Sequence, residues 1–134
     1  MLGFEALRDQ TNADSTAFRR PQPRLAEGRA LAPIATAMMD VSDGLLIDAS
    51  RMAQASNVTF AIDSASVPFP ASLPPARQDE AMRWGDDYEL LFTLPPGTNP
   101  PISAHHIGTA LPPSGSPITV DGAVPHGALG YTHD

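Results

Sequence analysis

The sequence predicts an α+β domain in which a mixed β-sheet packs against helices in layers. Two observations lead to this fold class. An apolar run at residues 34–39 is followed by an apolar stripe with the helical period at residues 45–55, and further short strand candidates recur through the second half of the chain. The 134 residues suit one domain of ordinary size. Alternating helices and strands of this kind favour a layered architecture.

Residues 1–31 contain two predicted helices joined by an extended linker. The apolar pattern in residues 1–12 is too short to fold alone and indicates the end of a longer helix. The prolines at positions 21 and 23 enforce an extended approach, and Pro23 suits the first turn of a helix running to about Leu31. We therefore expect residues 1–20 to be the remnant of an interdomain helix and linker, and residues 21–134 to form the domain proper.

The elements that follow are predicted from their periodicity. The run at 34–39 predicts a strand that stops at Asp40, and the segment from Leu45 to Ala55 predicts a helix, with Ser42 or Asp43 as its N-cap. A short helix is expected at residues 77–84. Strands are expected at 58–62, 88–94, around 107 and at 118–120, with Pro-rich loops between several of them.

Composition excludes several classes of protein. The net charge is −7, and all eight basic residues are arginines, which argues against binding to nucleic acid or anionic lipid. The chain has no cysteine, so disulfides and thiolate metal sites are excluded. No apolar run approaches the length of a membrane span, and the N-terminus lacks the form of a signal peptide. The expectation is a soluble cytoplasmic protein.

The segment D-V-S-D-G at residues 40–44 is the first candidate functional site. It joins the end of a strand to the start of a helix, which is where α/β proteins bind ligands and where free N–H groups attract phosphate. Two carboxylates beside a phosphate would need a cation, and Mg²⁺ prefers such oxygen ligands. The alternative is structural: Asp40 ends the strand, a polar side chain caps the helix, and Gly44 makes the turn. The residues alone leave both readings open.

The segment G-D-D-Y-E at residues 85–89 is the second candidate. Three carboxylates directly before a buried strand are unusual for packing and are free to meet a cation or hydrogen-bond donors. The alternative is an Asp-rich turn closed by its own hydrogen bonds. Elsewhere, the adjacent His105 and His106 would point to opposite faces of a strand, which disfavours a shared metal ion. With no lysine in the chain, a P-loop is excluded.

Taken together, these segments resemble thiamine-monophosphate kinases. The resemblance is carried in order by P-Q-P-R-L-A-E-G at 21–28, D-V-S-D-G-L at 40–45, A-S at 55–56, G-D-D-Y-E-L-L-F-T at 85–93, I-G at 107–108, V-D-G at 120–122 and G-Y-T-H at 130–133. It implies the C-terminal domain of an aminoimidazole ribonucleotide synthetase-like fold. It also implies an ATP- and Mg²⁺-dependent kinase that converts thiamine monophosphate to thiamine diphosphate by direct phosphoryl transfer.

The same resemblance implies roles for individual residues. Asp40 and Asp43 would be Mg²⁺ ligands, and Ser42 would contact ATP. Asp86 would contact the thiamine phosphate substrate, and Tyr131 would lie against the thiamine moiety. No residue of this chain is assigned a catalytic role in the chemical step, and Asp87 and Glu89 receive supporting roles only.

The chain also departs from the family pattern. Trp84 stands where a small residue is usual, which puts the packing of the following loop in doubt. The family's N-terminal domain supplies further metal and phosphate contacts and the homodimer interface of the full-length enzyme, and nothing like it occurs here. We therefore expect the chain alone to have little activity. A non-catalytic module that binds nucleotide or thiamine phosphate, and a domain of a related ATP-dependent synthetase, are the alternatives.

Overall fold

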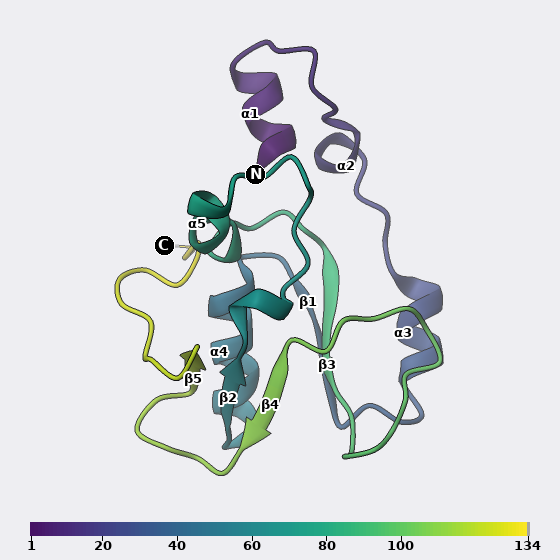
Figure 1. The fold of residues 1–134 in the computed structure, drawn as a ribbon. Helices are drawn as coiled ribbons and strands as arrows, with labels where there is room; N and C mark the ends of the chain where they lie inside the picture. Colours follow the sequence, from purple (N-terminus) through teal and green to yellow (C-terminus); the bar gives the residue numbers. More distant parts are fainter. Residues whose placement is uncertain (134) are drawn as a thin grey trace.

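The computed structural model describes residues 1–133 and contains helices packed against two small sheets (Figure 1). The helices and strands follow one another in this order: α1 (Leu2–Arg8), α2 (Thr16–Arg19), α3 (Leu25–Leu31), β1 (Ala37–Val41), α4 (Leu45–Ser56), β2 (Thr59–Ile62), the 3₁₀ turns η1 (Ser64–Ser66) and η2 (Pro75–Arg77), α5 (Gln78–Met82), β3 (Glu89–Thr93), β4 (Gly108–Leu111) and β5 (Ile118–Val120). The predicted α+β class is confirmed. None of the helices within the described residues is long and apolar enough to cross a membrane.

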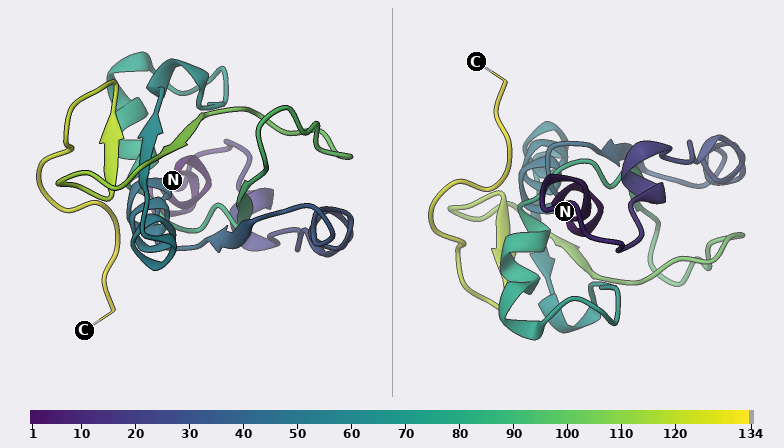
Figure 2. Two further views of the ribbon diagram at one scale, coloured as in Figure 1. Left: turned by 90° about the horizontal axis from the view of Figure 1, so that it is seen from below. Right: turned by 90° about the horizontal axis from the view of Figure 1, so that it is seen from above.

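The strands form two sheets instead of the single predicted one. Strands β1 and β3 pair antiparallel, with Asp40 opposite Leu90. In the other sheet the order is β4-β2-β5, with β2 antiparallel to β4 and parallel to β5, so this sheet is mixed as expected. Seen along the vertical axis of the first view, strands β2, β4 and β5 are grouped at one side of the molecule (Figure 2).

Helix α4 lies between the two sheets and holds them in one core. It packs on β1, β2 and β5. Its predicted apolar stripe is confirmed, because Leu46, Ala49, Met52 and Ala53 are buried and Leu45 is half-buried. The other buried side chains of this cluster come from β2, α5 and β5: Phe60, Ile62, Met82 and Ile118.

The two faces of the β1–β3 pair have different surroundings. Ala37, Met39 and Leu91 pack against the core. On the opposite face, Asp40 and Leu90 line a cavity beside α3. The strand does not stop at Asp40 as predicted but continues to Val41, which is buried. The end of the apolar run does not mark the end of the strand. Asp40 belongs to the strand, and it is polar because it lies on the face turned away from the core.

Helix α1 is docked on the segment that leads into the G-D-D-Y-E loop. The Phe4 ring lies 5.6 Å from the Trp84 ring and 5.7 Å from the Phe18 ring, between ring centroids. Arg77 donates to both carboxylate oxygens of Glu5, at 2.6 and 3.0 Å. Residues 1–18 are therefore tied by aromatic and ionic contacts to the part of the domain that precedes β3.

Candidate functional site

The turn between β1 and α4 is held by a buried carboxylate that the sequence interpretation missed. Oδ2 of Asp48 accepts the backbone N–H groups of Ser42 and Asp43, each at 3.0 Å. The Asp48 side chain is only 1% exposed. These two N–H groups are therefore already satisfied and are not open to a phosphate, contrary to the expectation for this loop. The sequence does carry a signal for Asp48: a carboxylate among the buried apolar positions of α4 indicates a buried hydrogen-bonding role.

The predicted N-cap of α4 is wrong. The N-cap residue is Gly44, and neither Ser42 nor Asp43 makes a side-chain cap hydrogen bond. Gly44 has φ of 127°, which a side chain would strain, and a Cβ there would lie 2.8 Å from the carbonyl oxygen of Arg83. Capping was predicted from residue type alone, whereas Asp48 reaches back from inside the helix to hold the turn.

The Asp43 carboxylate is engaged on both oxygens. Arg51 donates to Oδ2, and Nε2 of His133 lies 3.1 Å from Oδ1. The Asp43 side chain is 12% exposed. The hydrogen bond from Arg51 is the main cause that holds the pKa of Asp43 below its usual range, and His133 adds to it. Asp43 is thus a shielded, ionised carboxylate with a cation already beside it.

The G-D-D-Y-E loop lies directly on this turn. Asp86 donates its N–H to the carbonyl of Ser42 at 3.1 Å, and Tyr88 donates to the carbonyl of Val41 at 2.9 Å. A Cβ at Gly85 would lie 2.4 Å from the same Ser42 oxygen, so only glycine permits the approach. Asp86 and Tyr88 adopt φ of 72° and 53°, a left-handed conformation that aspartate tolerates but that is costly for tyrosine. Such strain is characteristic of functional loops.

The C-terminal segment completes the cluster. Tyr131 donates its N–H to the carbonyl of Asp43 at 2.9 Å, and a Cβ at Gly130 would lie 2.4 Å from that oxygen. Tyr131 is 62% exposed, and its ring meets the His133 ring edge-on, with centroids 4.9 Å apart. Three segments that are distant in the sequence therefore meet through backbone hydrogen bonds around Asp43, which the motifs alone could not establish.

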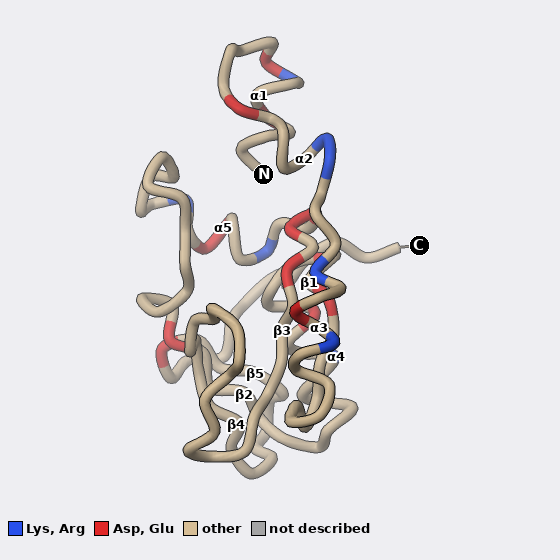
Figure 3. Tube along the Cα trace, turned by 90° about the vertical axis from the view of Figure 1, so that its right-hand side faces the viewer, with Lys and Arg blue, Asp and Glu red and all other residues tan. Residues whose placement is uncertain are grey.

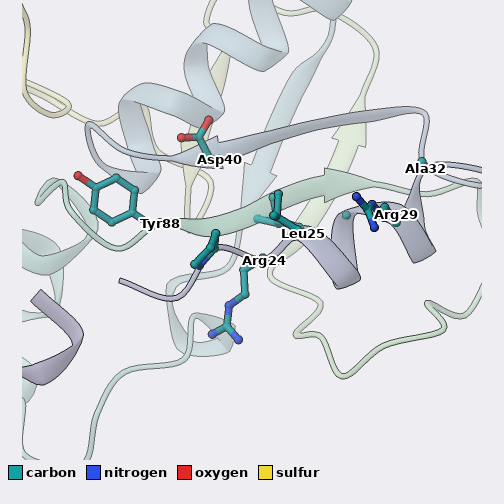
Figure 4. Close-up of a pocket in the computed structure, with 9 residues that line it drawn as sticks. Arg24, Leu25, Arg29, Ala32, Asp40 and Tyr88 are labelled. Carbon is teal, nitrogen blue, oxygen red and sulfur yellow. The ribbon is translucent and has the colours of Figure 1, made fainter. Parts of the chain in front are cut away.

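Asp40 lies apart from this cluster. It lines a cavity of about 460 Å³ between α3 and the β1–β3 pair, together with Leu25, Tyr88 and Leu90. Figure 4 shows the Asp40 carboxylate and the Tyr88 ring at one end of this cavity. Arg24 at its rim turns away and donates to Glu89, at 2.6 Å in the shorter bond. In Figure 3, acidic positions gather beside β1 with basic ones among them.

The two predicted metal ligands are not arranged as a metal site. Asp43 is engaged by Arg51 and His133, whereas Asp40 lines the cavity beside α3. Within residues 1–133, no group of three or more His, Cys, Asp or Glu side chains is placed to hold a metal ion. The carboxylates suit Mg²⁺ in chemical type, but their arrangement here does not fit the ion.

Comparison with known proteins finds one family and a consistent set of relatives. Residues 4–100 match the family described as "AIR synthase related protein, C-terminal domain". The thiamine-monophosphate kinase of Escherichia coli K12 is 41% identical over 81 residues, which cover 57% of this chain and 25% of that protein. The enzyme of the same name from Aquifex aeolicus is 34% identical over 111 residues, covering 77% of this chain and 36% of that protein.

Solved structures give the same result. The complex "AaThiL complexed with AMPPCP and TMP" matches with a TM-score of 0.79 and 28% identity, covering 97% of this chain and 47% of that one. Thiamine-monophosphate kinase from Stenotrophomonas maltophilia K279a matches with a TM-score of 0.75 and 29% identity, covering 90% of this chain and 46% of that one. The chain thus spans about a quarter of the curated E. coli relative and about half of the solved chains.

Proposed function

This chain belongs to the AIR synthase related proteins by its C-terminal domain, and on that premise we propose that it is the C-terminal domain of a thiamine-monophosphate kinase. The relatives it resembles carry that name. The observation that carries the proposal is the meeting of residues 41–43, 86–88 and 131–133, which lie within the segments that bear the family motifs. Residues 1–20 would then be the interdomain helix and linker, and residues 21–134 the kinase domain.

The proposed reaction is a direct phosphoryl transfer. A phosphate oxygen of thiamine monophosphate attacks the γ-phosphorus of ATP, a new P–O bond forms, and the bond to the β-phosphate oxygen breaks to release ADP. Little covalent chemistry is asked of the protein in such a transfer, because positioning and charge stabilisation supply most of the catalysis. A domain that only brings binding loops together, without a nucleophile or a general base, is consistent with this chemistry.

We assign the binding roles to residues at the meeting point. Ser42 contacts ATP, Asp86 contacts the thiamine phosphate substrate, and Tyr131 lies against the thiamine rings. The exposed Tyr131 ring and the exposed Asp86 side chain are both accessible to a ligand. A solved relative described as complexed with AMPPCP and TMP supports a site for these two classes of ligand.

The complete enzyme is proposed to depend on Mg²⁺, to act in the cytoplasm and to work as a homodimer. When bound, Mg²⁺ neutralises phosphate charge, and Asp40 and Asp43 are the carboxylates of this chain that would serve it. For Mg²⁺ to bind, Asp43 would have to release Arg51 or His133, and further ligands would have to come from outside the chain. We therefore propose that an N-terminal kinase domain is needed for turnover.

The test separates binding from turnover. Isothermal titration should detect binding of thiamine monophosphate or AMPPCP to the chain, and thiamine diphosphate should form only after a kinase N-terminal domain is added. Full activity of the chain alone would contradict the need for that domain. If neither binding nor turnover occurs in its presence, the kinase proposal is wrong. Binding without turnover, even with the added domain, would favour a non-catalytic module.

A matched pair of variants locates the substrate site. Asp86→Asn keeps a residue that tolerates the left-handed backbone but removes the charge, and should weaken binding of thiamine monophosphate about tenfold. Asp9→Asn removes one carboxylate from an exposed ion pair with Arg8 and should leave binding unchanged. Equal affinities for the two variants would exclude Asp86 from the site.

A further inference from the structure

The C-terminal segment, residues 124–133, has no helix or strand, and Arg83 holds its middle. Nη1 of Arg83 donates to the carbonyl oxygen of His126 at 3.1 Å and to that of Ala128 at 2.7 Å. Within residues 1–133, these are the hydrogen bonds that reach residues 124–130. In Figure 1 the segment, drawn in yellow, leaves β5 and runs up to α5, which Arg83 directly follows. Leu129 adds an apolar contact with the core, so Arg83 supplies the directional part of the docking.

Arg83 is itself held in place through its other two nitrogens. Nε and Nη2 donate to the two carboxylate oxygens of Asp79, at 2.8 and 3.1 Å. The Arg83 side chain is 21% exposed, whereas that of Asp79 is 67% exposed. An ion pair with so exposed a partner contributes little to stability, but a planar guanidinium bound through all three nitrogens has a fixed orientation. The contact with Asp79 therefore orients Arg83 toward the C-terminal segment.

Arg83 lies close in sequence to one proposed substrate contact, and the carbonyls that it holds lie close to the other. Asp86 follows Arg83 by three residues, and Tyr131 follows the second bound carbonyl by three. The N–H groups of Asp86 and Tyr131 both donate to carbonyls of the turn between β1 and α4. A single hydrogen bond fixes the point where a segment meets this turn, but it lets the segment pivot there. The second contact, from Arg83, sets the direction of the segment that carries Tyr131.

We propose that Arg83 is a positioning residue, which fixes the C-terminal segment against α5 so that Tyr131 and Asp86 engage one molecule of thiamine monophosphate together. This inference rests on the proposed function, because it takes those two residues as substrate contacts. Arg83 touches no ligand in this role. A site that is ordered before its substrate arrives loses less conformational entropy on binding. Affinity for thiamine monophosphate should therefore depend on Arg83, whereas affinity for the nucleotide, which is assigned to Ser42, should not.

The first test measures the docking of the segment in the folded chain, without any ligand. Arg83→Met keeps an unbranched stem and removes every donor, so the Tyr131 amide should exchange its hydrogen about tenfold faster by NMR, because its hydrogen bond opens more often. Amides of α4 should keep their exchange rates. Arg83→Lys retains a cation that can donate to the carbonyls and should give an intermediate rate. Arg8→Met, at an exposed ion pair with Asp9, is the matched control and should change nothing.

The second test measures affinity by isothermal titration, with the added N-terminal kinase domain present. Arg83→Met should weaken binding of thiamine monophosphate about tenfold and leave binding of AMPPCP unchanged. In a Tyr131→Ala chain, Arg83→Met should cause no further loss, because a residue that acts through Tyr131 has nothing left to position. Circular dichroism and melting curves establish that each variant is folded. Arg83→Lys, the milder change, should lose part of the affinity, and it decides both tests if Arg83→Met does not fold.

Several outcomes would overturn the inference. They are an unchanged exchange rate at Tyr131, an unchanged affinity for thiamine monophosphate, and an equal loss of affinity for both ligands, which would mean that Arg83 only stabilises the fold. A further loss in the Tyr131→Ala chain would also exclude action through Tyr131. If the inference fails in one of these ways while the wild-type chain binds thiamine monophosphate, the kinase proposal stands. A wild-type chain that binds neither ligand beside the added domain would end both.

Discussion

Single residues at the meeting of the three loops decide whether the site can form. Gly85 and Gly130 allow their two backbone segments to approach the carbonyl oxygens of Ser42 and Asp43. Asp48 holds the same turn by accepting its backbone N–H groups. The glycines were part of the recognised motifs. Asp48 lies outside those motifs. A carboxylate on an otherwise apolar helix face indicates that it has a buried partner, but the sequence does not identify that partner.

Gly85→Ala should destabilise the domain. The added Cβ would lie 2.4 Å from the Ser42 oxygen, and forcing such a clash costs about 1–3 kcal/mol. Gly115→Ala is the matched control, because a Cβ added there would meet nothing within 4 Å, and the change should be within about 0.5 kcal/mol. Urea denaturation of both variants measures the difference. Equal stabilities would mean that the loop separates without cost.

Asp48→Asn should cost about 3 kcal/mol of unfolding free energy, because buried donors that lose a charged acceptor each cost about 1–3 kcal/mol. Asp121→Asn is the control, because Asp121 accepts two hydrogen bonds, both from Ser64, at an exposed site. Its loss should be about 1 kcal/mol or less. Chemical denaturation tests the pair, and a smaller loss for Asp48→Asn than for Asp121→Asn would contradict the assigned role.

Among the elements, α1 differs most from the sequence prediction, because the structure shows it docked on the rest of the domain. Its period predicts a helix correctly, but the pattern could not reveal that Phe4 and Glu5 dock on Trp84 and Arg77, more than seventy residues away. Contacts at such separation depend on the tertiary fold. Trp84 is the only tryptophan of the chain, so it reports on this docking.

Phe4→Ala should loosen α1 and shift the fluorescence of Trp84 to longer wavelength. Each aromatic pair contributes about 0.5–1.5 kcal/mol beyond its buried area, and Phe4 makes two of them. Leu7→Ala removes an apolar side chain that is 42% exposed on the same helix and should change the emission little. An unchanged spectrum in Phe4→Ala would show that α1 does not rely on this contact.

The docking of α1 should also weaken in acid. The hydrogen bonds from Arg77 lower the pKa of Glu5 below its unfolded value, so the stabilisation is complete above the unfolded pKa and is lost as pH falls through the folded one. The Trp84 emission should therefore change at a pH below about 4.3, the ordinary pKa of Glu. Glu5→Gln should remove this transition, and a Glu5→Gln titration identical to wild type would assign it to another group.

The whole molecule depends on one helix that joins two sheets. The α4 stripe and the strands at β3 and β5 were predictable, because their periodicity and composition are local. The division into two sheets was not, since β1 pairs with a strand about fifty residues later and no local pattern names that partner. The candidate site follows the same rule. The motifs predict Asp40, Ser42, Asp43, Asp86 and Tyr131 as binding residues, whereas the pairing of Asp43 with Arg51 required the fold.

Leu46→Ala should weaken both sheets together. Leu46 is fully buried on α4, and truncating such a side chain costs about 2–5 kcal/mol. Leu25→Ala, at a position 67% exposed, should cost far less. Unfolding followed by circular dichroism and by Trp84 fluorescence should remain a single coincident transition. Two separated transitions would mean that the sheets unfold independently.

The left-handed conformations of Asp86 and Tyr88 have an evolutionary consequence. Glycine or asparagine at position 88 would relieve backbone strain, so selection for stability alone should replace this tyrosine. Selection for ligand binding should preserve the side chains of the loop at the expense of stability. Libraries of this domain sorted separately for stability and for binding should therefore diverge first at position 88.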